Sequence, residues 1–290
     1  MSITVTGATG QLGHLIVESL LRRGVPPDQI VAVGRNVAKA ADLGDRGVVV
    51  VPADYDDVDS LRRAFAGTDE LMFVSGYEAG KRAQHRNVIG VAKDAGVGLV
   101  AYTSIAKADR STLKLAADHR ATEQQITASA LPYVLLRHSW YLENYTSQLP
   151  AYLEHGIIGA AGDGKVSAAT RADFAEAAAA VLTTGGHTNR VYELGGEAFT
   201  MMELAAEISR QTGRQVTSTD LPVDKYIEVL AAAGTPEPVA ELIADGDRGV
   251  ARGDLHVEGD DLDRLIGRRP TSLADATRAV LGPTHTKYPF

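Results

Sequence analysis

The 290-residue sequence predicts an α/β fold, a Rossmann-type doubly wound parallel sheet followed by a smaller C-terminal α/β lobe. Short β-rich runs alternate with segments of helical periodicity from the first residues onward. The runs are apolar at both odd and even positions, which is typical of strands buried on both faces of a parallel sheet. A glycine-rich turn joins the first run to the first helix, where doubly wound folds place a ligand.

The expected strands follow one another through the first half of the chain. They are residues 3–6, 30–33, 48–51, 71–74, 99–103 and 133–136. Helical segments begin between them, near Leu12, Ala38, Val58, Gln84 and Ala117. This alternation predicts an NAD(P)-binding Rossmann domain over residues 1–136.

The pattern loosens after residue 136. A glycine-rich stretch at residues 156–164 precedes an alanine-rich helix at 173–182, a strand at Arg190–Leu194 and a helix that begins near Met201. Pro222, Pro236 and Pro238 interrupt the remainder. We therefore expect a smaller substrate-binding lobe over residues 137–290, with about residues 173–195 returning to the main domain.

Composition restricts the partners and the location. The net charge of −8, with basic residues only in scattered pairs, argues against nucleic acid. No apolar run approaches the ~20 residues of a membrane helix, and the first strand begins too early for a signal segment. We expect a cytoplasmic protein with no membrane partner. With no cysteine, and eight histidines that form no H-E-x-x-H pair, we also expect no metal site.

The first turn, VTGATGQLGH at residues 5–14, predicts a nucleotide site. In the setting of a strand before and a helix after, Gly7 would let the strand turn sharply and Gly10 would let the backbone approach a pyrophosphate. Gly13 would let the helix pack closely on the sheet. The N–H groups at the start of the helix, with its dipole behind them, then favour an anion.

The residues after the second strand predict which dinucleotide binds. The strand runs into Gly34-Arg35-Asn36, with Lys39 one turn further on and no carboxylate in the expected place. An arginine there accommodates the 2′-phosphate of NADP, in a charge-assisted bond of about 1.5–3 kcal/mol. We therefore expect NADPH. Asp54, after the third strand, would either accept from the adenine amino group or cap the helix that begins near Val58.

Several segments resemble a known family. VTGATGQLGH, VGRNVAKA, ADYDD, QHRNVI, AYTSI, LLRHSWYLENY and AAGDGK are similar to the NmrA-like atypical short-chain dehydrogenase/reductases, and within that group to the bacterial zinc-independent quinone reductases. The resemblance runs nearly end to end, and LLRHSWYLENY with AAGDGK is its most specific part. It implies a Rossmann domain that holds NADPH, a small lobe that closes a cleft over the nicotinamide, and hydride transfer to a quinone.

The resemblance also implies site residues. The cofactor-binding residues would be Gly7, Ala8, Thr9, Gly10, Gln11, Leu12, Arg35, Lys39, Val74, Ser75 and Gly76. The nicotinamide and quinone pocket would be lined by His138, Ser139, Trp140, Tyr141, Leu142, Glu143 and Asn144. The sequence departs from the family pattern in the loop SGYEAG after Val74 and in carrying His138, which leaves the shape of the substrate mouth open.

A catalytic acid is not evident. Many short-chain dehydrogenases use a Tyr-x-x-x-Lys pair on the helix after the fifth strand, and the single match, Tyr77 to Lys81, follows the fourth strand instead. We interpret that match as chance. The catalytic candidates are His119, near the usual place of the lysine, and Tyr141. His119 would either support the nicotinamide ribose or the substrate, or be a polar surface residue.

The absence of an acid pair favours a quinone over an isolated ketone. A quinone spreads the incoming charge over a conjugated ring, so positioning beside the nicotinamide supplies much of what the reaction needs. The rings of Trp140, Tyr141 and Tyr145 would hold a flat acceptor, or else Trp140 and Tyr141 form the core between the lobes.

We expect an oxidoreductase that transfers hydride directly from NADPH to a quinone, with no flavin and no metal. The first alternative is a non-enzymatic NADP(H)-binding redox sensor that acts through a protein partner. A nucleotide-sugar epimerase or isomerase comes last, because those enzymes need the tyrosine–lysine pair. We expect a monomer or a homodimer.

Overall fold

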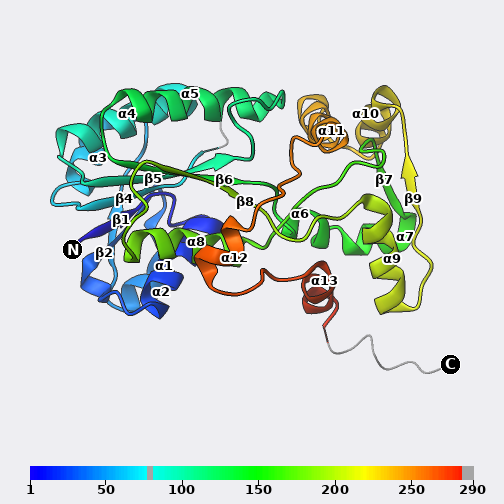
Figure 1. Ribbon diagram of the computed structural model, residues 1–290, viewed down its shortest axis with the longest axis horizontal. Coiled ribbons are helices and arrows are strands. Elements are labelled where there is room, and N and C mark those ends of the chain that lie inside the picture. The colour runs from blue at the N-terminus through cyan, green and yellow to red at the C-terminus, as the bar shows by residue number, and fades with distance from the viewer. Residues whose placement is uncertain (77–80, 283–290) are drawn as a thin grey trace.

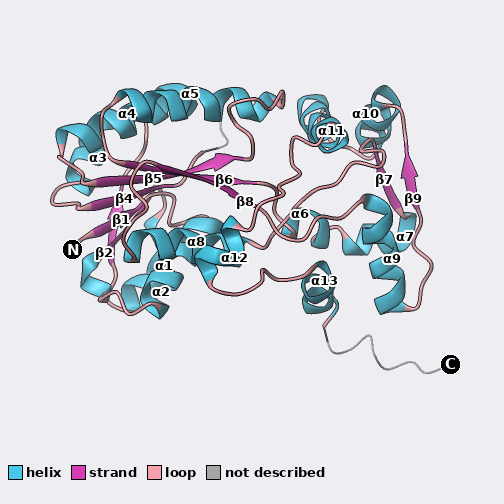
Figure 2. Ribbon diagram, viewed as in Figure 1, coloured by secondary structure: helices cyan, strands magenta, loops and turns pink. Residues whose placement is uncertain are grey.

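A seven-stranded parallel sheet forms the centre of the computed structural model, which describes residues 1–76 and 81–282 (Figures 1 and 2). The strand order is β3-β2-β1-β4-β5-β6-β8, and every neighbouring pair is parallel. The strands are β1 (Ile3–Val5), β2 (Ile30–Gly34), β3 (Val49–Pro52), β4 (Glu70–Phe73), β5 (Leu99–Ile105), β6 (Tyr133–His138) and β8 (Arg190–Leu194). The predicted doubly wound α/β fold is confirmed. The order reverses between β1 and β4, whose carboxyl ends form the switch point where such folds bind ligands.

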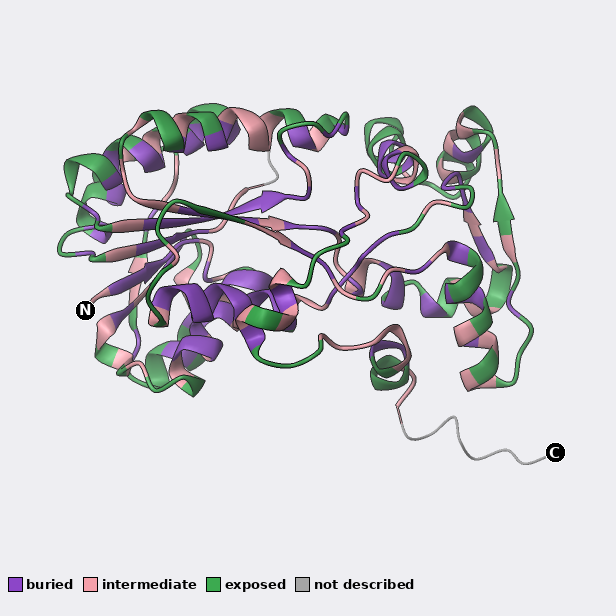
Figure 3. Cartoon of the chain, viewed as in Figure 1, coloured by how far each residue is buried: buried purple, intermediate pink, exposed green. Residues whose placement is uncertain are grey.

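Helices cover both faces of the sheet (Figure 1). One layer holds α1 (Gln11–Arg22), α8 (Arg171–Thr183) and α12 (Asp261–Ile266), and the other holds α3 (Val58–Ala64), α4 (Lys81–Asp94) and α5 (Lys114–Ala128). Short helical turns η1 (Pro27–Gln29), η2 (Val37–Ala40) and α2 (Ala41–Asp45) flank β2. Buried alanines of α8 let its backbone come close to α1 and the sheet, so the inner faces are closely packed (Figure 3).

The prediction of strands buried on both faces is right for the central strands and wrong at the edges of the sheet. β1, β4 and β5 are buried almost throughout. On the edge strands, Val49 of β3 and Val191 of β8 are each 43% exposed. Outer strands have one neighbour and incomplete helix cover, so an apolar run alone overstates their burial.

A second group of elements follows β6 and lies beyond the carboxyl ends of the strands (Figure 1). It contains the two-stranded parallel sheet of β7 (Ile157–Gly159) and β9 (Ser218–Asp220). Its helices are α6 (Glu143–Thr146), α7 (Leu149–His155), α9 (Met201–Thr212), α10 (Val223–Ala232), α11 (Glu237–Ala251) and α13 (Leu273–Leu281). The sequence analysis did not predict β7 or β9, because each has only three residues and, unlike the equally short β1, is not followed by a glycine turn that opens a helix.

The segment with α8 and β8 packs with the first half of the chain, since β8 pairs with β6 and α8 lies against α1. The division into residues 1–136 and 137–290 stays a prediction. Within residues 1–76 and 81–282, none of the helices combines the length and the apolar character that a membrane crossing requires.

Candidate active site

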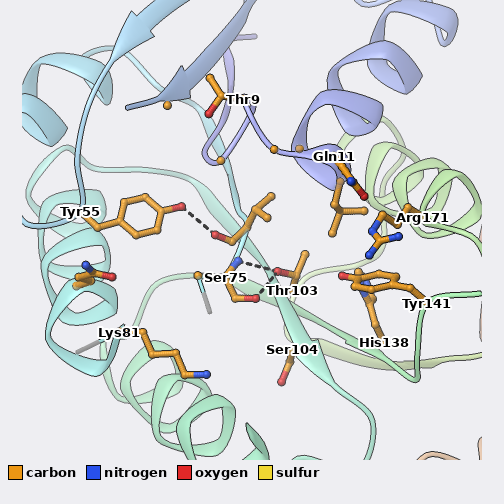
Figure 4. A pocket seen from close by; sticks show the side chains of 18 of the residues that line it. Thr9, Gln11, Tyr55, Ser75, Lys81, Thr103, Ser104, His138, Tyr141 and Arg171 are labelled. Carbon is orange, nitrogen blue, oxygen red and sulfur yellow. Dashed lines mark hydrogen bonds between the residues drawn. The ribbon is translucent and has the colours of Figure 1, made fainter. Parts of the chain in front are cut away.

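A cavity of about 710 Å³ opens at the carboxyl ends of the central strands (Figure 4). Its wall is built from the turn after β1, the ends of β2 to β6, the first turns of α4 and α5, the segment after β6 and the first residue of α8. The volume is within the ~300–1,000 Å³ of small-molecule sites. The switch point of the sheet is therefore hollowed, as the fold class predicts.

The glycine turn is shaped by close backbone contacts. Gly7 has φ +64°, a left-handed conformation that glycine adopts without strain. A Cβ on Gly13 would lie 2.3 Å from the Gly7 carbonyl oxygen, and one on Gly34 would lie 2.6 Å from the Thr9 side chain. Gly10 stands at the N-cap of α1 with no side-chain cap, so the first turn of the helix is left to a ligand.

The predicted pyrophosphate residues line the cavity with one exception. Gly7, Thr9, Gly10, Gln11 and Leu12 all lie in its wall. Ala8 does not, because its side chain is buried in the core and its N–H donates to the Val33 carbonyl at 2.9 Å. The structure does not bring Ala8 into the cavity wall, and its contact with the cofactor stays a prediction.

Basic residues lie at one end of the cavity, after β2. Arg35 and Lys39 both line it. The hydroxyl of Tyr55, which sequence analysis missed, lies 2.6 Å from Thr6 Oγ1 and 2.8 Å from the Val74 carbonyl oxygen. Burial raises the pKa of Tyr55 well above its usual range, and Arg35 opposes that shift with its positive charge. Tyr55 is thus a neutral ring that joins the ends of β1 and β4.

Asp54 does not cap α3. The cap is Asp57, whose Oδ1 accepts from the N–H groups of Asp59 and Ser60 at 3.1 Å. Asp54 accepts from the Asp56 N–H and lines the cavity. The capping alternative is wrong, and the contact with adenine stays a prediction.

The segment after β4 runs along the middle of the cavity. The Ser75 N–H donates to Thr103 Oγ1 at 2.8 Å, and the Thr103 hydroxyl donates to Ser75 Oγ at 3.1 Å (Figure 4). These bonds tie the segment to the end of β5, so Val74, Ser75 and Gly76 lie in the wall as expected. Tyr77 of the Tyr77–Lys81 match lies outside the described residues.

The end of β6 brings His138 into the wall. Its ring stacks on Phe174, with centroids 4.3 Å apart and planes 11° apart, and neither ring nitrogen has a hydrogen-bond partner among the described residues. Burial lowers the pKa of His138 to about 3. Beside it, the Ser139 hydroxyl donates to the Leu255 carbonyl at 2.6 Å. The cavity therefore meets a neutral, fixed imidazole here.

The buried imidazole makes stability depend on pH. Below about pH 6.5 the unfolded chain binds a proton that folded His138 takes up only near its pKa of about 3. His138 therefore lowers the free energy of unfolding as the pH falls through that window, and its own contribution is about 2 kcal/mol between pH 7 and pH 5. His138→Phe keeps the stacking and removes this titration. In urea unfolding, the loss from pH 7 to pH 5 should shrink by that amount. An unchanged loss in His138→Phe would contradict the account.

The segment after His138 divides between cavity and core. Ser139, Trp140, Tyr141 and Asn144 line the cavity. Leu142 is buried in the second core, and Tyr145 packs edge-on against Phe199 in the same core, with centroids 5.5 Å apart. The structure therefore does not bring Leu142 and Tyr145 into the cavity wall, and their acceptor contacts stay predictions. Trp140 and Tyr141 line the cavity and also pack against core residues, so the core alternative holds for them and the contact with an acceptor stays a prediction.

Arg171 is a cavity residue that sequence analysis missed. It is the first residue of α8, which Thr170 caps by accepting from the Asp173 N–H at 3.1 Å. Its guanidinium carbon lies 4.3 Å over the Tyr141 ring (Figure 4). Its Nη2 donates to Asn144 Oδ1 at 3.3 Å.

Arg171 also links two cavities. With Thr9 and Gln11 it lines both the main cavity and an adjoining one of about 430 Å³. Glu143 lines the adjoining cavity and pairs with Arg171 at 3.4 Å. An arginine beside an uncapped helix start fits a phosphate group.

The face of α5 carries no tyrosine toward the cavity. Leu115 and His119, one turn apart, line the wall together. His119 Nδ1 lies 2.9 Å from the Tyr102 hydroxyl, so the surface alternative for His119 is wrong. Burial, followed by the charge of Lys81, lowers the pKa of His119 to about 3. The helix therefore offers a neutral imidazole and an aliphatic side chain where a tyrosine–lysine pair would stand.

Among the described residues, no three His, Asp or Glu side chains are grouped to hold a metal.

Comparisons with known proteins agree with this geometry. A family model described as NAD(P)H-binding matches residues 7–185. The chain is 48% identical over 277 residues to quinone oxidoreductase 2 of Escherichia coli. The matched region covers 94% of this chain and 96% of that protein. The crystal structure of the NADPH-dependent quinone oxidoreductase from Escherichia coli complexed with NADPH matches with a TM-score of 0.94 at 46% identity, over 97% of this chain and 100% of that one. Triphenylmethane reductase from Citrobacter sp., complexed with NADP(H), matches with a TM-score of 0.92 at 40% identity, over 97% and 100% of the two chains.

Proposed function

This chain belongs to the NAD(P)H-binding family, and from that premise we propose that it is an NADPH-dependent quinone reductase. The observation that carries the proposal is the chemistry of the cavity end beside His138. It combines Trp140 and Tyr141 with Leu115 where a tyrosine acid would stand. Such a site suits a flat acceptor that spreads its charge and needs no positioned acid.

The residues present fit a bound NADPH. The uncapped start of α1 and the glycine cradle that a Cβ at Gly13 would fill suit a pyrophosphate. Arg35 and Lys39 suit the 2′-phosphate, and Arg171 lies close enough to the glycine turn to share the phosphate charge. When bound, NADPH supplies a hydride. The segment of Val74, Ser75 and Gly76 would hold the cofactor along its length.

The chain's own part in the reaction is positioning. Trp140 and Tyr141 would hold the acceptor ring against the nicotinamide, and Asn144 is fixed by Arg171 at the same wall. The acceptor gains a hydride and, from solvent, one proton, which gives the hydroquinone. His119 and His138 are neutral at pH 7, so neither is a cation for this reaction. A cytoplasmic location and a monomeric or homodimeric state stay part of this proposal.

Steady-state assays test the function. Purified protein should oxidise NADPH in the presence of simple benzoquinones and naphthoquinones, with no added flavin or metal. The absence of turnover on every quinone would contradict the proposal. Tight NADPH binding without turnover, together with a stable protein complex, would instead indicate a redox sensor.

Arg35→Ala tests the choice of cofactor. Arg35 lines the cavity after β2, where a guanidinium would form a charge-assisted bond of about 1.5–3 kcal/mol with the 2′-phosphate. We expect wild type to prefer NADPH over NADH by at least about tenfold in kcat/KM and Arg35→Ala to lose most of that preference. Arg63→Ala, at an exposed position on α3, should keep it. Equal use of both cofactors by wild type would overturn the role of Arg35.

A further inference from the structure

Lys81, the first residue of α4, is a buried cation in the wall of the cavity. It is 5% exposed and lines the cavity with Gln84, Ser104 and His119. Lysine is almost never fully buried unless paired, because removing an ammonium from water is unfavourable. Such a cost at the wall of a reaction cavity points to a role in function.

Lys81 shares its ion-pair partner with a second cation. Lys81 Nζ lies 3.3 Å from Asp118 Oδ2, and Arg82 Nε lies 2.5 Å from Asp118 Oδ1. One carboxylate is therefore shared by two cations, with a net charge of +1. Burial raises the pKa of Asp118, but Arg82 and Lys81 outweigh it and hold that pKa below its usual value. Burial, followed by the charge of Lys81, lowers the pKa of His85 to about 4, so that neighbour is neutral.

Lys81 points toward the reacting end of the cavity. Figure 4 shows its ammonium directed at Ser104, below Ser75. The neighbouring hydroxyls are committed elsewhere, since Ser104 donates to Glu123 Oε1 at 2.6 Å and Thr103 donates to Ser75. An ammonium has three N–H donors, and its ion-pair partner among the described residues is Asp118. Lys81 can thus donate to a ligand oxygen.

We propose that Lys81 donates a hydrogen bond to the quinone oxygen on which negative charge develops. The proposal rests on the proposed function and makes Lys81 a catalytic residue of that reaction. The hydride brings an electron pair to the acceptor ring, the carbonyl π bond opens, and the pair ends on oxygen as a hydroquinonate. A proton from solvent then completes the hydroquinone. The fixed charge of Lys81 stabilises the oxyanion without a positioned acid.

Lys81→Met and Lys81→Arg test this role on a series of quinones whose hydroquinones differ in acidity. Removing one oxyanion donor typically lowers kcat by about 10²–10³-fold. We expect Lys81→Met to show a loss of that size for the acceptor with the least acidic hydroquinone and a smaller loss as the acidity rises. NADPH affinity should stay within about twofold of wild type, since less than about 0.5 kcal/mol of binding is involved. Lys81→Arg should recover part of the rate.

One control and one further variant keep the outcomes distinct. Lys225→Met, at an exposed lysine of α10 paired with Glu228, should behave as wild type. If Lys81→Met does not fold, Lys81→Gln keeps a donor without the charge, and the same dependence on acidity is expected. Wild-type rates in Lys81→Met would overturn the inference. An equal loss of rate on every quinone, together with weaker NADPH binding, would also overturn it, because the ammonium would then contact the cofactor. Wild type without quinone turnover would instead refute the proposed function.

Discussion

Gly13→Ala should weaken NADPH binding by at least about tenfold, because it forces apart the turn that receives the pyrophosphate. A Cβ at this position would lie 2.3 Å from the Gly7 carbonyl oxygen, 2.6 Å from the Gly7 carbonyl carbon and 2.9 Å from the Ala8 Cα. All three are backbone atoms and cannot rotate away. Such overpacking costs typically about 1–3 kcal/mol, and each 1.4 kcal/mol is tenfold in affinity. Titration of the protein with NADPH, followed by nicotinamide fluorescence, measures the change.

Gly90→Ala is the matched control. Gly90 is also a helical glycine, in α4, and a Cβ there would meet nothing within 4 Å. The substitution should stabilise the protein by about 0.5–1 kcal/mol and leave NADPH affinity unchanged. If Gly13→Ala weakens NADPH binding and Gly90→Ala does not, the need for glycine at position 13 comes from its contact with Gly7. Equal NADPH affinity in both variants would contradict the role of the turn.

Arg137→Met should cost about 3–5 kcal/mol in the free energy of unfolding, because it leaves a buried carboxylate without its partner. Arg137 of β6 donates from Nε and Nη2 to the two oxygens of Glu123, at 2.9 and 2.6 Å. Its Nη1 reaches Glu193 of β8 at 3.0 Å. The side chains of Arg137 and Glu123 are 11% and 8% exposed, so water cannot replace the lost bonds. Urea unfolding monitored by circular dichroism measures the loss.

Two further variants separate the cost of an unpaired buried charge from the cost of a lost contact. Arg137→Met with Glu123→Gln removes the orphaned charge and should recover much of the loss. Arg264→Met, in an exposed ion pair with Asp261 on α12, should cost about 0–1 kcal/mol. A loss in Arg137→Met as small as in Arg264→Met would show that the network contributes little. Because Glu123 also accepts from Ser104 in the cavity wall, the account further expects reduced turnover in Arg137→Met.

Local signals predicted the cofactor end of the site. The spacing of Gly7, Gly10 and Gly13 between a strand and a helix is a local requirement, and the structure has the close contacts that demand glycine. Arg35 was found because the end of the second strand has a fixed place beside that turn. The cap of α3 is Asp57 and not Asp54. Both aspartates precede the helix, so the local sequence could not tell which of them caps it.

The acceptor end depends on contacts between distant segments. Arg171 lies far along the chain from Gln11, and Lys81 enters the wall because α4 packs beside α5. Arg171 belongs to no motif, and the Tyr-x-x-x-Lys match at Tyr77–Lys81, which follows the fourth strand, does not by itself place Lys81 in the cavity wall. In the segment after His138, a short irregular stretch sends Trp140 and Tyr141 to the cavity but Leu142 to the core. Without periodicity, the sequence could not separate these faces.

The most direct test of direct hydride transfer is a single-turnover reaction with NADPH deuterated at the transferring C4 position. Protein stripped of any flavin would be mixed with one equivalent of this cofactor and a naphthoquinone, and the oxidation would be followed by absorbance. The account predicts stoichiometric oxidation of NADPH, formation of one hydroquinone per NADPH and a primary isotope effect on the rate of the chemical step. NADPH that remains bound and unoxidised, or oxidation that begins only when flavin is added, would contradict it.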